Sequence, residues 1–119
     1  GTSGVVGVGN SIVGVTGDDM QSTEVAALAN GNYVLASPSW DNGGVLNAGA
    51  ATLSNGDGGT TGAVDTSNSL YGTTAGDGVG DFVVALTNGN FVVRSFGWSA
   101  NRGAVTWGIA NDELANWFV

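Results

Sequence analysis

Short apolar runs alternate along this chain with turns rich in Gly, Asn and Asp. The clearest example is the run at 25–28, the turn Asn30-Gly31-Asn32 and the run at 33–37. Asn-Gly is a strong hairpin signal because both residues tolerate positive φ. The pattern therefore predicts a tight antiparallel hairpin. A second hairpin is predicted from the runs 83–86 and 91–95 around the turn 88–90.

The strands of both hairpins are apolar at consecutive positions rather than at alternate ones. Strict alternation would indicate a sheet with one wet face. Consecutive apolar residues indicate burial on both faces, as in the inner strands of a layered sheet. We therefore expect each hairpin to lie between two other layers.

The two hairpins belong to a longer duplication. When residues 1–44 are laid on residues 59–102, an offset of 58, 18 of the 44 columns are identical. From Gly49 and Gly103 onward the match continues at an offset of 54, so the second copy lacks four residues of a loop. A period of this length is typical of stacked or radially repeated units.

The duplication predicts two repeats, 1–58 and 59–119, the second with a divergent tail at 109–119. Each copy has a third strand, at 48–54 or 103–108, and a looser fourth strand, at 62–72 or 4–14. A stretch at 111–117 is compatible with a short helix or an extended tail. The predicted fold is all-β, with two tandem four-stranded antiparallel units that resemble propeller blades.

The order of these strands is offset relative to the repeat. The chain opens with a fourth strand, continues with a complete unit at 25–72, and then has strands one to three of another unit at 83–108. An N-terminal fourth strand can complete the sheet of a neighbouring chain as a donated strand. We therefore expect strand exchange between chains.

Composition removes several classes of function. The chain has two Arg, no Lys, His or Cys, and ten acidic residues, for a net charge of −8. Nucleic acids and anionic membranes require clustered Lys and Arg, and nucleophilic triads or zinc sites require His or Cys. We therefore expect no enzyme and no cofactor. Apolar residues make up 42% of the chain, which favours a packed core over disorder.

The hairpin region resembles the FG-GAP repeat of integrin-α-type β-propellers, and also Gly/Asn-rich repeats of bacterial secreted surface proteins. The resemblance rests on the apolar strand 25–28, the turn 30–32, the corner at 34–38 and the strand 48–51. In the second copy it rests on 83–86, 88–90, 92–96 and 103–105. It implies a propeller blade, and a location outside the cell.

FG-GAP blades often carry a calcium loop of alternating Asp and Asn, and this chain departs from that pattern. The turns 30–32 and 88–90 hold no carboxylate, whereas calcium takes six to eight oxygen ligands. The remaining weak candidates are Asp19, Asp77 and Asp81. We expect no metal, and interpret these acids as solvated turn residues.

Two Trp residues hold equivalent places after the second strand of each copy. Trp40 with Asp41 and Asn42 could form a platform that stacks on a sugar, and so could Trp98 with Asn101 and Arg102. The alternative is structural: Trp40 and Trp98 close the edges of the blades while Trp107 packs between sheets.

The remaining candidates concern assembly. The segment 4–14 carries neither the charge nor the Pro that normally protects an edge strand, which favours Val5, Val6, Val8 and Ile12 as pairing residues. The apolar end Trp117, Phe118 and Val119 is expected to dock on a neighbour.

The sequence thus predicts a non-enzymatic, secreted structural module of the cell surface. It assembles with copies of itself into a ring, three chains giving six blades, or into an open fibre. The alternative is a propeller lectin built from two-blade chains. The start at Gly1 is also compatible with an excerpt of a longer propeller protein.

Overall fold

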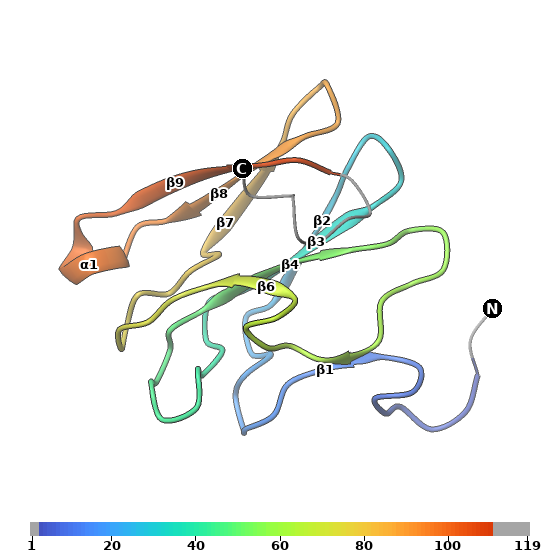
Figure 1. The fold of residues 1–119 in the computed structure, drawn as a ribbon, viewed down its shortest axis with the longest axis horizontal. Helices are drawn as coiled ribbons and strands as arrows, with labels where there is room; N and C mark the ends of the chain where they lie inside the picture. Colours follow the sequence, from blue (N-terminus) through green and yellow to red (C-terminus); the bar gives the residue numbers. More distant parts are fainter. Residues whose placement is uncertain (1–2, 111–119) are drawn as a thin grey trace.

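The computed structural model describes residues 3–110. Strands dominate this part of the chain, and the helix is a single short turn (Figure 1). The elements are β1 (Ile12–Val13), β2 (Glu24–Ala27), β3 (Tyr33–Ser37), β4 (Ala50–Ser54), β5 (Gly62–Ala63), β6 (Ser69–Tyr71), β7 (Phe82–Ala85), β8 (Phe91–Ser95), α1 (Trp98–Asn101) and β9 (Ala104–Gly108).

These strands form three sheets in the described part of the chain. An antiparallel sheet has the order β2-β3-β4-β6, a second has the order β7-β8-β9, and β1 pairs in parallel with β5. The all-β prediction is therefore confirmed, together with repeated units. No helix between residues 3 and 110 has the length and apolar character needed to cross a bilayer.

The hairpins form where the sequence predicts them, but their loops are longer than a two-residue turn. The N–H of Leu28 donates to the carbonyl of Asn32 (2.9 Å), and the N–H of Gly31 donates to the carbonyl of Leu28 (3.1 Å). Gly31 has a φ of +94° while Asn30 keeps a negative φ. This is a three-residue loop that ends in a glycine bulge. The second hairpin repeats it at Leu86, Gly89 and Asn90.

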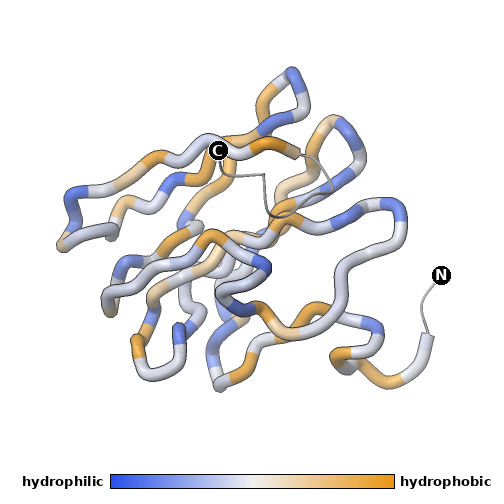
Figure 2. The backbone as a smooth tube through the Cα atoms, in the orientation of Figure 1, coloured by the Kyte–Doolittle hydropathy of each residue, from blue (hydrophilic) through white to orange (hydrophobic). Residues whose placement is uncertain are grey.

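The main core lies between the two larger sheets. Val34, Ala51 and Leu53 from the first sheet pack in one cluster with Phe91 and Val93 from the second, and all five are at most 2% exposed. Hydrophilic residues gather at the loop tips and apolar ones along the strands (Figure 2). The sheet β7-β8-β9 therefore covers one face of β2-β3-β4-β6.

The opposite face of the first sheet is covered by the N-terminal segment. Trp40, Ala50 and Val64 form a second buried cluster, against which Ile12 and Met20 pack. The order in space is therefore the β1–β5 pair, then the four-stranded sheet, then the three-stranded sheet (Figure 1). The sheets of the two units are thus successive layers, while β5 and β6, which belong to the second copy in sequence, lie in the layers of the first.

Burial on both faces is confirmed for the hairpin strand β3 but not for β2, β7 or β8. Every residue of β4 is buried, because layers cover both sides of it. In β8 and β9, buried or half-buried residues alternate with more exposed ones. The prediction of two-sided burial is wrong for β7 and β8 because, within residues 3–110, no layer covers the far side of the second sheet. It is wrong for β2 because this strand lies at the edge of the first sheet and most of its residues are exposed.

The segment before β1 reproduces the local structure of its counterpart 58 residues later. The Asn10 side chain accepts from the Gly7 N–H (3.0 Å) and donates to the Val5 carbonyl (3.1 Å). Asn68 does the same with the Asp65 N–H and the Ala63 carbonyl. The fourth strands predicted at 4–14 and 62–72 are therefore shorter than expected, because Ile12–Val13 and Ser69–Tyr71 are each preceded by a turn that an Asn side chain closes. The predicted strand 62–72 is also divided, since Gly62–Ala63 pairs in parallel with β1 in a separate sheet.

Candidate interaction surface

One face of the second sheet is apolar and exposed. Alternate residues of β7 and β9 point to this side, where Phe82, Val84, Val105 and Trp107 are 45, 45, 72 and 43% exposed. Val92 of β8 lies on the same face, opposite Val84 and Trp107. We call these five residues the outer face. Contiguous exposed apolar side chains of this kind mark interaction sites on soluble proteins.

The corresponding face of the first sheet is covered. Val34, Ala51 and Leu53 stand where the second copy has Val92, Val105 and Trp107. They are 0, 0 and 2% exposed, because the second sheet packs on them. The outer face is therefore the repeat equivalent of an interface that is already formed once within the chain.

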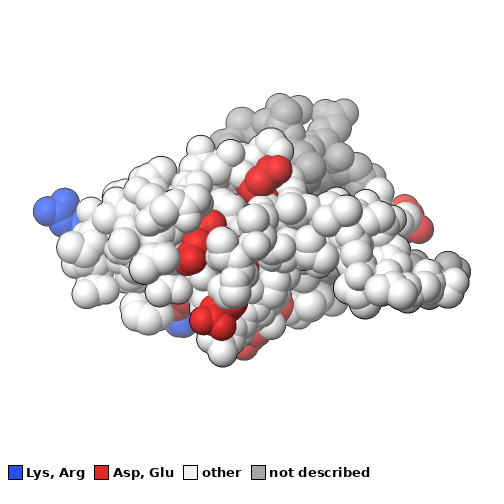
Figure 3. Space-filling model, turned by 90° about the horizontal axis from the view of Figure 1, so that it is seen from below, with Lys and Arg blue, Asp and Glu red and all other residues white. Residues whose placement is uncertain are grey.

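Arg94 of β8 interrupts this apolar side. The Arg94 guanidinium donates twice to Asp81 Oδ2, at 2.9 and 3.1 Å, and lies 5.2 Å from the centroid of the Phe82 ring. The ion pair neutralises the charge and holds the guanidinium against an aromatic ring. Figure 3 views the molecule from below Figure 1, where acidic side chains are scattered between large uncharged areas.

The far edge of β9 has no partner strand among residues 3–110. In the first sheet the equivalent edge of β4 pairs with β6, in the register Ala51–Leu70 and Thr52–Ser69. The β9 sequence, Ala104 to Gly108, contains no charge and no Pro. Natural edge strands usually carry such protection, so this edge is suited to pairing.

The strand β1 presents a matching edge. The carbonyl of Ser11 accepts from the Gly62 N–H (2.9 Å), and the carbonyl of Val13 accepts from the Val64 N–H (3.0 Å). Successive peptide groups of a strand point to opposite edges. The N–H and carbonyl of Ile12 therefore point away from β5, toward a side where the described residues place no strand.

A buried carboxylate holds this segment against the first unit. Asp19 is 1% exposed and accepts from the N–H of Val15 (2.7 Å), the N–H and hydroxyl of Thr16 (both 2.8 Å) and the N–H of Asp41 (2.9 Å). The bond to Asp41 joins the N-terminal segment to the loop after β3. Burial acts to raise the pKa of Asp19, but the donors on Thr16, Asp41 and Val15 outweigh it and hold that pKa below its usual value.

The second copy repeats this arrangement. Asp77 is 2% exposed and accepts from the N–H groups of Thr73 (3.2 Å), Thr74 (3.1 Å) and Ser99 (3.1 Å). Each donor lies 58 residues after its counterpart at the Asp19 site. The N-terminal segment is therefore seated on the first unit as the β6 region is seated on the second.

These contacts replace the interpretation of Asp19 and Asp77 as solvated turn residues, because both are buried and satisfied by protein donors. Asp81 is engaged by Arg94. The structure does not bring the three weak calcium candidates together, and residues 3–110 hold no cluster of three acidic residues suited to a metal.

The two predicted sugar platforms differ in accessibility. Trp40 is 4% exposed, and its Nε1 has no hydrogen-bond partner in the described part of the chain. Trp40 lines a pocket of about 230 Å³ together with Asp41 and Asn42, but its low exposure leaves little ring surface on which a sugar could stack. Asp41 accepts from the Asn47 N–H (2.8 Å), and Asn42 donates to the Gly72 carbonyl (3.1 Å). Both side chains thus stabilise the loop.

The second platform remains open. Trp98 is 44% exposed, and Asn101 and Arg102 beside it are exposed. The backbone here is unusual, because Ser99, Ala100 and Asn101 have positive φ values of 52, 58 and 68°. The turn α1 is thus partly left-handed, and no sequence pattern indicated it.

The predicted assembly residues fall into three groups. Val5, Val6 and Val8 are 93, 76 and 62% exposed and lie in the turn before β1 rather than in a strand. Ile12 is half-buried against the second cluster. Trp117, Phe118 and Val119, with the predicted 111–117 element, lie outside the described residues. The prediction that Trp107 packs between sheets is wrong within the described chain, because its side of β9 is uncovered.

One pair of residues was missed at the sequence level. The hydroxyls of Thr52 and Ser69 share a hydrogen bond of 2.7 Å across the β4–β6 ladder. Their repeat equivalents are Thr106 and Ser11, and both residue types are unchanged. The sequence shows that each residue is identical in the two copies, but only the strand register shows that the two positions face each other.

The chain matches the family model described as a repeat of unknown function (DUF5650) over residues 1–23, 27–81 and 85–116. It belongs to this family of repeats. The second and third matched segments begin 58 residues apart, in agreement with the duplication. No curated protein and no solved structure matches the chain.

Proposed function

We propose that this repeat protein is a non-enzymatic self-assembly module. Separate chains join head to tail, with β9 of one chain pairing with β1 of the next. This contact reproduces the β4–β6 pairing of the first sheet and completes the three-stranded sheet with a fourth strand. Each completed sheet then resembles a propeller blade. The chains form a ring if the rotation between successive chains closes, and a fibre if it does not.

The observation that carries the proposal is the equivalence of the two unused edges. The bond from the Gly72 N–H to the Gly49 carbonyl (3.1 Å) extends the β4–β6 ladder, so Ala51 and Leu70 form a hydrogen-bonded pair two residues further on. The equivalents of these residues are Val105 and Ile12. They lie on the free edges of β9 and β1.

The proposed register places Val105 opposite Ile12 and Thr106 opposite Ser11. Thr106 has no side-chain partner among the described residues, and in this register its hydroxyl meets that of Ser11, as Thr52 meets Ser69. A slip by one residue would place every side chain of the strand on the wrong face. The register is therefore a specific expectation.

The contact also differs from a flexible strand donation. The Asp19 bonds and the packing of Ile12 already fix the N-terminal segment on its own chain. A second chain adds to that edge without displacing any strand of residues 3–110. Association of preformed edges avoids the entropic cost of ordering a free segment.

Cross-linking tests the proposal directly, because the chain has no Cys of its own. Ser11→Cys and Thr106→Cys are made in separate chains and mixed under mild oxidation. Directly opposite residues of a non-hydrogen-bonded antiparallel pair have Cα atoms about 4.5 Å apart, which a disulfide can span. The mixture should give a disulfide-linked heterodimer.

The control pairs Ser11→Cys with Val105→Cys, which places the two sulfurs on opposite faces of the sheet. Little cross-link is expected from that mixture. Equal yields from both mixtures, or no heterodimer from the first, would show that β9 and β1 do not pair. Light scattering of the unmodified chain then separates a trimeric ring from large fibres, and a clean monomer would contradict both.

The location follows from composition only. A Gly-, Asn- and Thr-rich chain without Lys suits an extracellular fibre or sheath that resists proteolysis, and we place the module at the cell surface on that basis. Protease resistance of the assembled material, compared with that of a variant that no longer assembles, tests this association.

A second candidate is a carbohydrate-binding site at Trp98, favoured by its exposed ring beside Asn101 and Arg102. Aromatic faces with neighbouring hydrogen-bond donors suit the apolar faces and hydroxyls of sugars. Glycan-array binding that is lost in Trp98→Ala and kept in Trp40→Phe would support a lectin. Absence of binding to any glycan would leave assembly as the function.

A further inference from the structure

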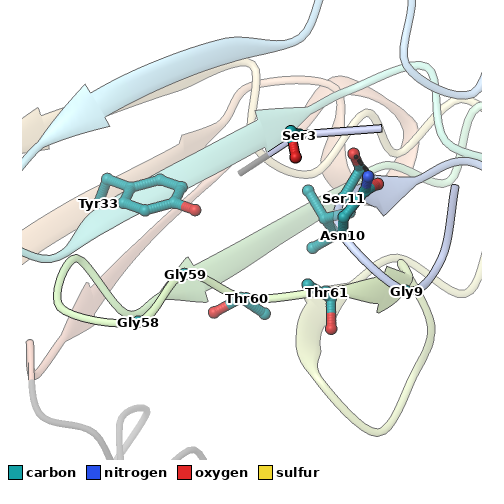
Figure 4. Close-up of a pocket in the computed structure, with 10 residues that line it drawn as sticks. Ser3, Gly9, Asn10, Ser11, Tyr33, Gly58, Gly59, Thr60 and Thr61 are labelled. Atoms are coloured by element: carbon teal, nitrogen blue, oxygen red, sulfur yellow. Dashed lines mark hydrogen bonds between the residues drawn. The ribbon is translucent and has the colours of Figure 1, made fainter. Parts of the chain in front are cut away.

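A pocket of about 580 Å³ lies at the N-terminal end of the molecule, beside Tyr33 (Figure 4). Tyr33 stands at one side of it, with its hydroxyl directed across the pocket toward the other lining side chains. The remaining walls come from the β1 segment and from the loop after β4. They include Ser3, Asn10, Ser11, Ile12, Thr60 and Thr61.

The same place in the second copy is filled. The equivalent of Tyr33 is Phe91, which is 0% exposed and belongs to the same buried cluster as Leu53 of the preceding unit. The junction between the two units thus places an aromatic side chain of one sheet in a common core with a β4 side chain of the sheet before it. At Tyr33, residues 3–110 supply no preceding sheet.

The side chain that corresponds to Leu53 is Trp107, which is 43% exposed on the outer face. In the register that places Val105 opposite Ile12, Trp107 lies opposite Asn10. Asn10 lines the pocket. Asn10 is therefore both the residue that the strand register places opposite Trp107 and a residue of the pocket wall.

We propose that Trp107 of one chain inserts into the Tyr33 pocket of the next. This inference rests on the head-to-tail assembly proposed above and names the side chain that anchors it. Val92 and Val105 of the outer face flank the anchor and cover the rim of the pocket.

The two copies differ at both positions of this contact, and the differences fit an interface whose surfaces are exposed to water before the chains associate. Copy one has Leu53 where copy two has Trp107, and copy two has Phe91 where copy one has Tyr33. At both positions the residue at the uncovered end, Trp107 or Tyr33, has an aromatic side chain with one polar atom. Such side chains bury a large apolar area and still satisfy a donor or acceptor at a polar rim. The hydroxyls and amide around the pocket supply partners for the indole N–H.

The experiment uses the Ser11→Cys and Thr106→Cys mixture as its readout of assembly. Trp107→Ala is introduced into the Thr106→Cys chain, and the cross-linking yield is measured against protein concentration. Loss of a central buried Trp typically weakens an interface strongly, so the concentration at half-maximal yield should rise about tenfold or more. Leu46→Ala, which removes another exposed apolar side chain (60% exposed), serves as the matched control and should leave the curve unchanged.

A second variant blocks the pocket instead of the anchor. Thr61→Trp fills the pocket from an exposed position and is introduced into the Ser11→Cys chain. It should shift the curve as Trp107→Ala does, but only when placed in the chain that supplies the pocket. Placed in the Thr106→Cys chain, which supplies β9, it should have no effect.

The outcomes separate the two proposals. No heterodimer in the parent mixture would overturn the assembly itself. Efficient cross-linking that is unaffected by Trp107→Ala and Thr61→Trp would leave strand pairing in place and overturn the insertion of Trp107. Circular dichroism and urea unfolding of each variant show whether a lost cross-link reflects a lost fold.

Discussion

Asp19→Asn is expected to destabilise the protein far more than its position in a turn suggests. The carboxylate is 1% exposed and receives three backbone N–H groups and one hydroxyl at 2.7 to 2.9 Å. Hydrogen bonds to a charged acceptor contribute about 1.5–3 kcal/mol each. An amide keeps one acceptor oxygen but directs an NH2 group at the donors around the other, so the free energy of unfolding should fall by about 2–4 kcal/mol.

Two matched variants calibrate this value. Asp77→Asn removes the equivalent contact, which has three donors at 3.1 to 3.2 Å, and should cost less because the bonds are fewer and longer. Asp57→Asn changes an exposed acid whose side chain accepts no hydrogen bond in the described structure, and should stay within about 0.5 kcal/mol of the parent. Urea unfolding at neutral pH, followed by Trp fluorescence, measures all three.

The pH dependence gives an independent reading. The native pKa of Asp19 lies below its unfolded value, which is about 3.9 in model peptides. Its contribution is therefore complete above that value and is lost as the pH falls through the native pKa. The difference between the parent and Asp19→Asn should shrink below about pH 4. A difference that stays constant down to acid pH, or an Asp19→Asn variant as stable as Asp57→Asn, would refute the argument.

Three further sets of substitutions test other parts of the fold. Ala100→Gly should raise the stability by about 0.5–1 kcal/mol, measured by urea unfolding, because Ala100 has a φ of +58° that glycine adopts without strain; a loss of stability would contradict the left-handed turn. Phe91→Ala should lower the free energy of unfolding by about 3–5 kcal/mol in the same assay, because it leaves a cavity at the centre of the core. Phe82→Ala on the outer face should lower it by less than about 1 kcal/mol. Equal losses for the two variants would contradict the position of the core. Gly31→Ala, at a φ of +94° with open space around it, should lower the free energy of unfolding by about 1–2 kcal/mol. Gly49→Ala should lower it further, because its Cβ would overlap the Val79 backbone nitrogen. A higher melting temperature for Gly49→Ala than for Gly31→Ala would contradict both environments.

Local signals in the sequence were sufficient for the strands of the two hairpins. The apolar runs and the Asn-Gly turns located both hairpins, since these depend on residues close together in the chain. The type of loop was harder to predict. It depends on the pairing of Leu28 with Asn32, which makes a three-residue loop with a glycine bulge at Gly31. The repeat offset correctly made the N-terminal segment the equivalent of the β6 region.

The interaction surface was harder to predict because it depends on which face each strand turns outward. Consecutive apolar residues in β8 predicted burial on both sides, while the structure leaves Val92 and Trp107 on an uncovered face. The sequence does not indicate the burial of Asp19, because one of its donors, the N–H of Asp41, lies 22 positions away along the chain. Pairs such as Thr106 and Ser11 emerge only when the register of one copy is transferred to the other.

The most direct test of head-to-tail assembly is the disulfide yield from mixed Ser11→Cys and Thr106→Cys chains. Pairing of β9 with β1 predicts an efficient heterodimer at this pair and little product from Ser11→Cys with Val105→Cys. A mixture that remains monomeric after oxidation, while both variants are folded, would contradict the account.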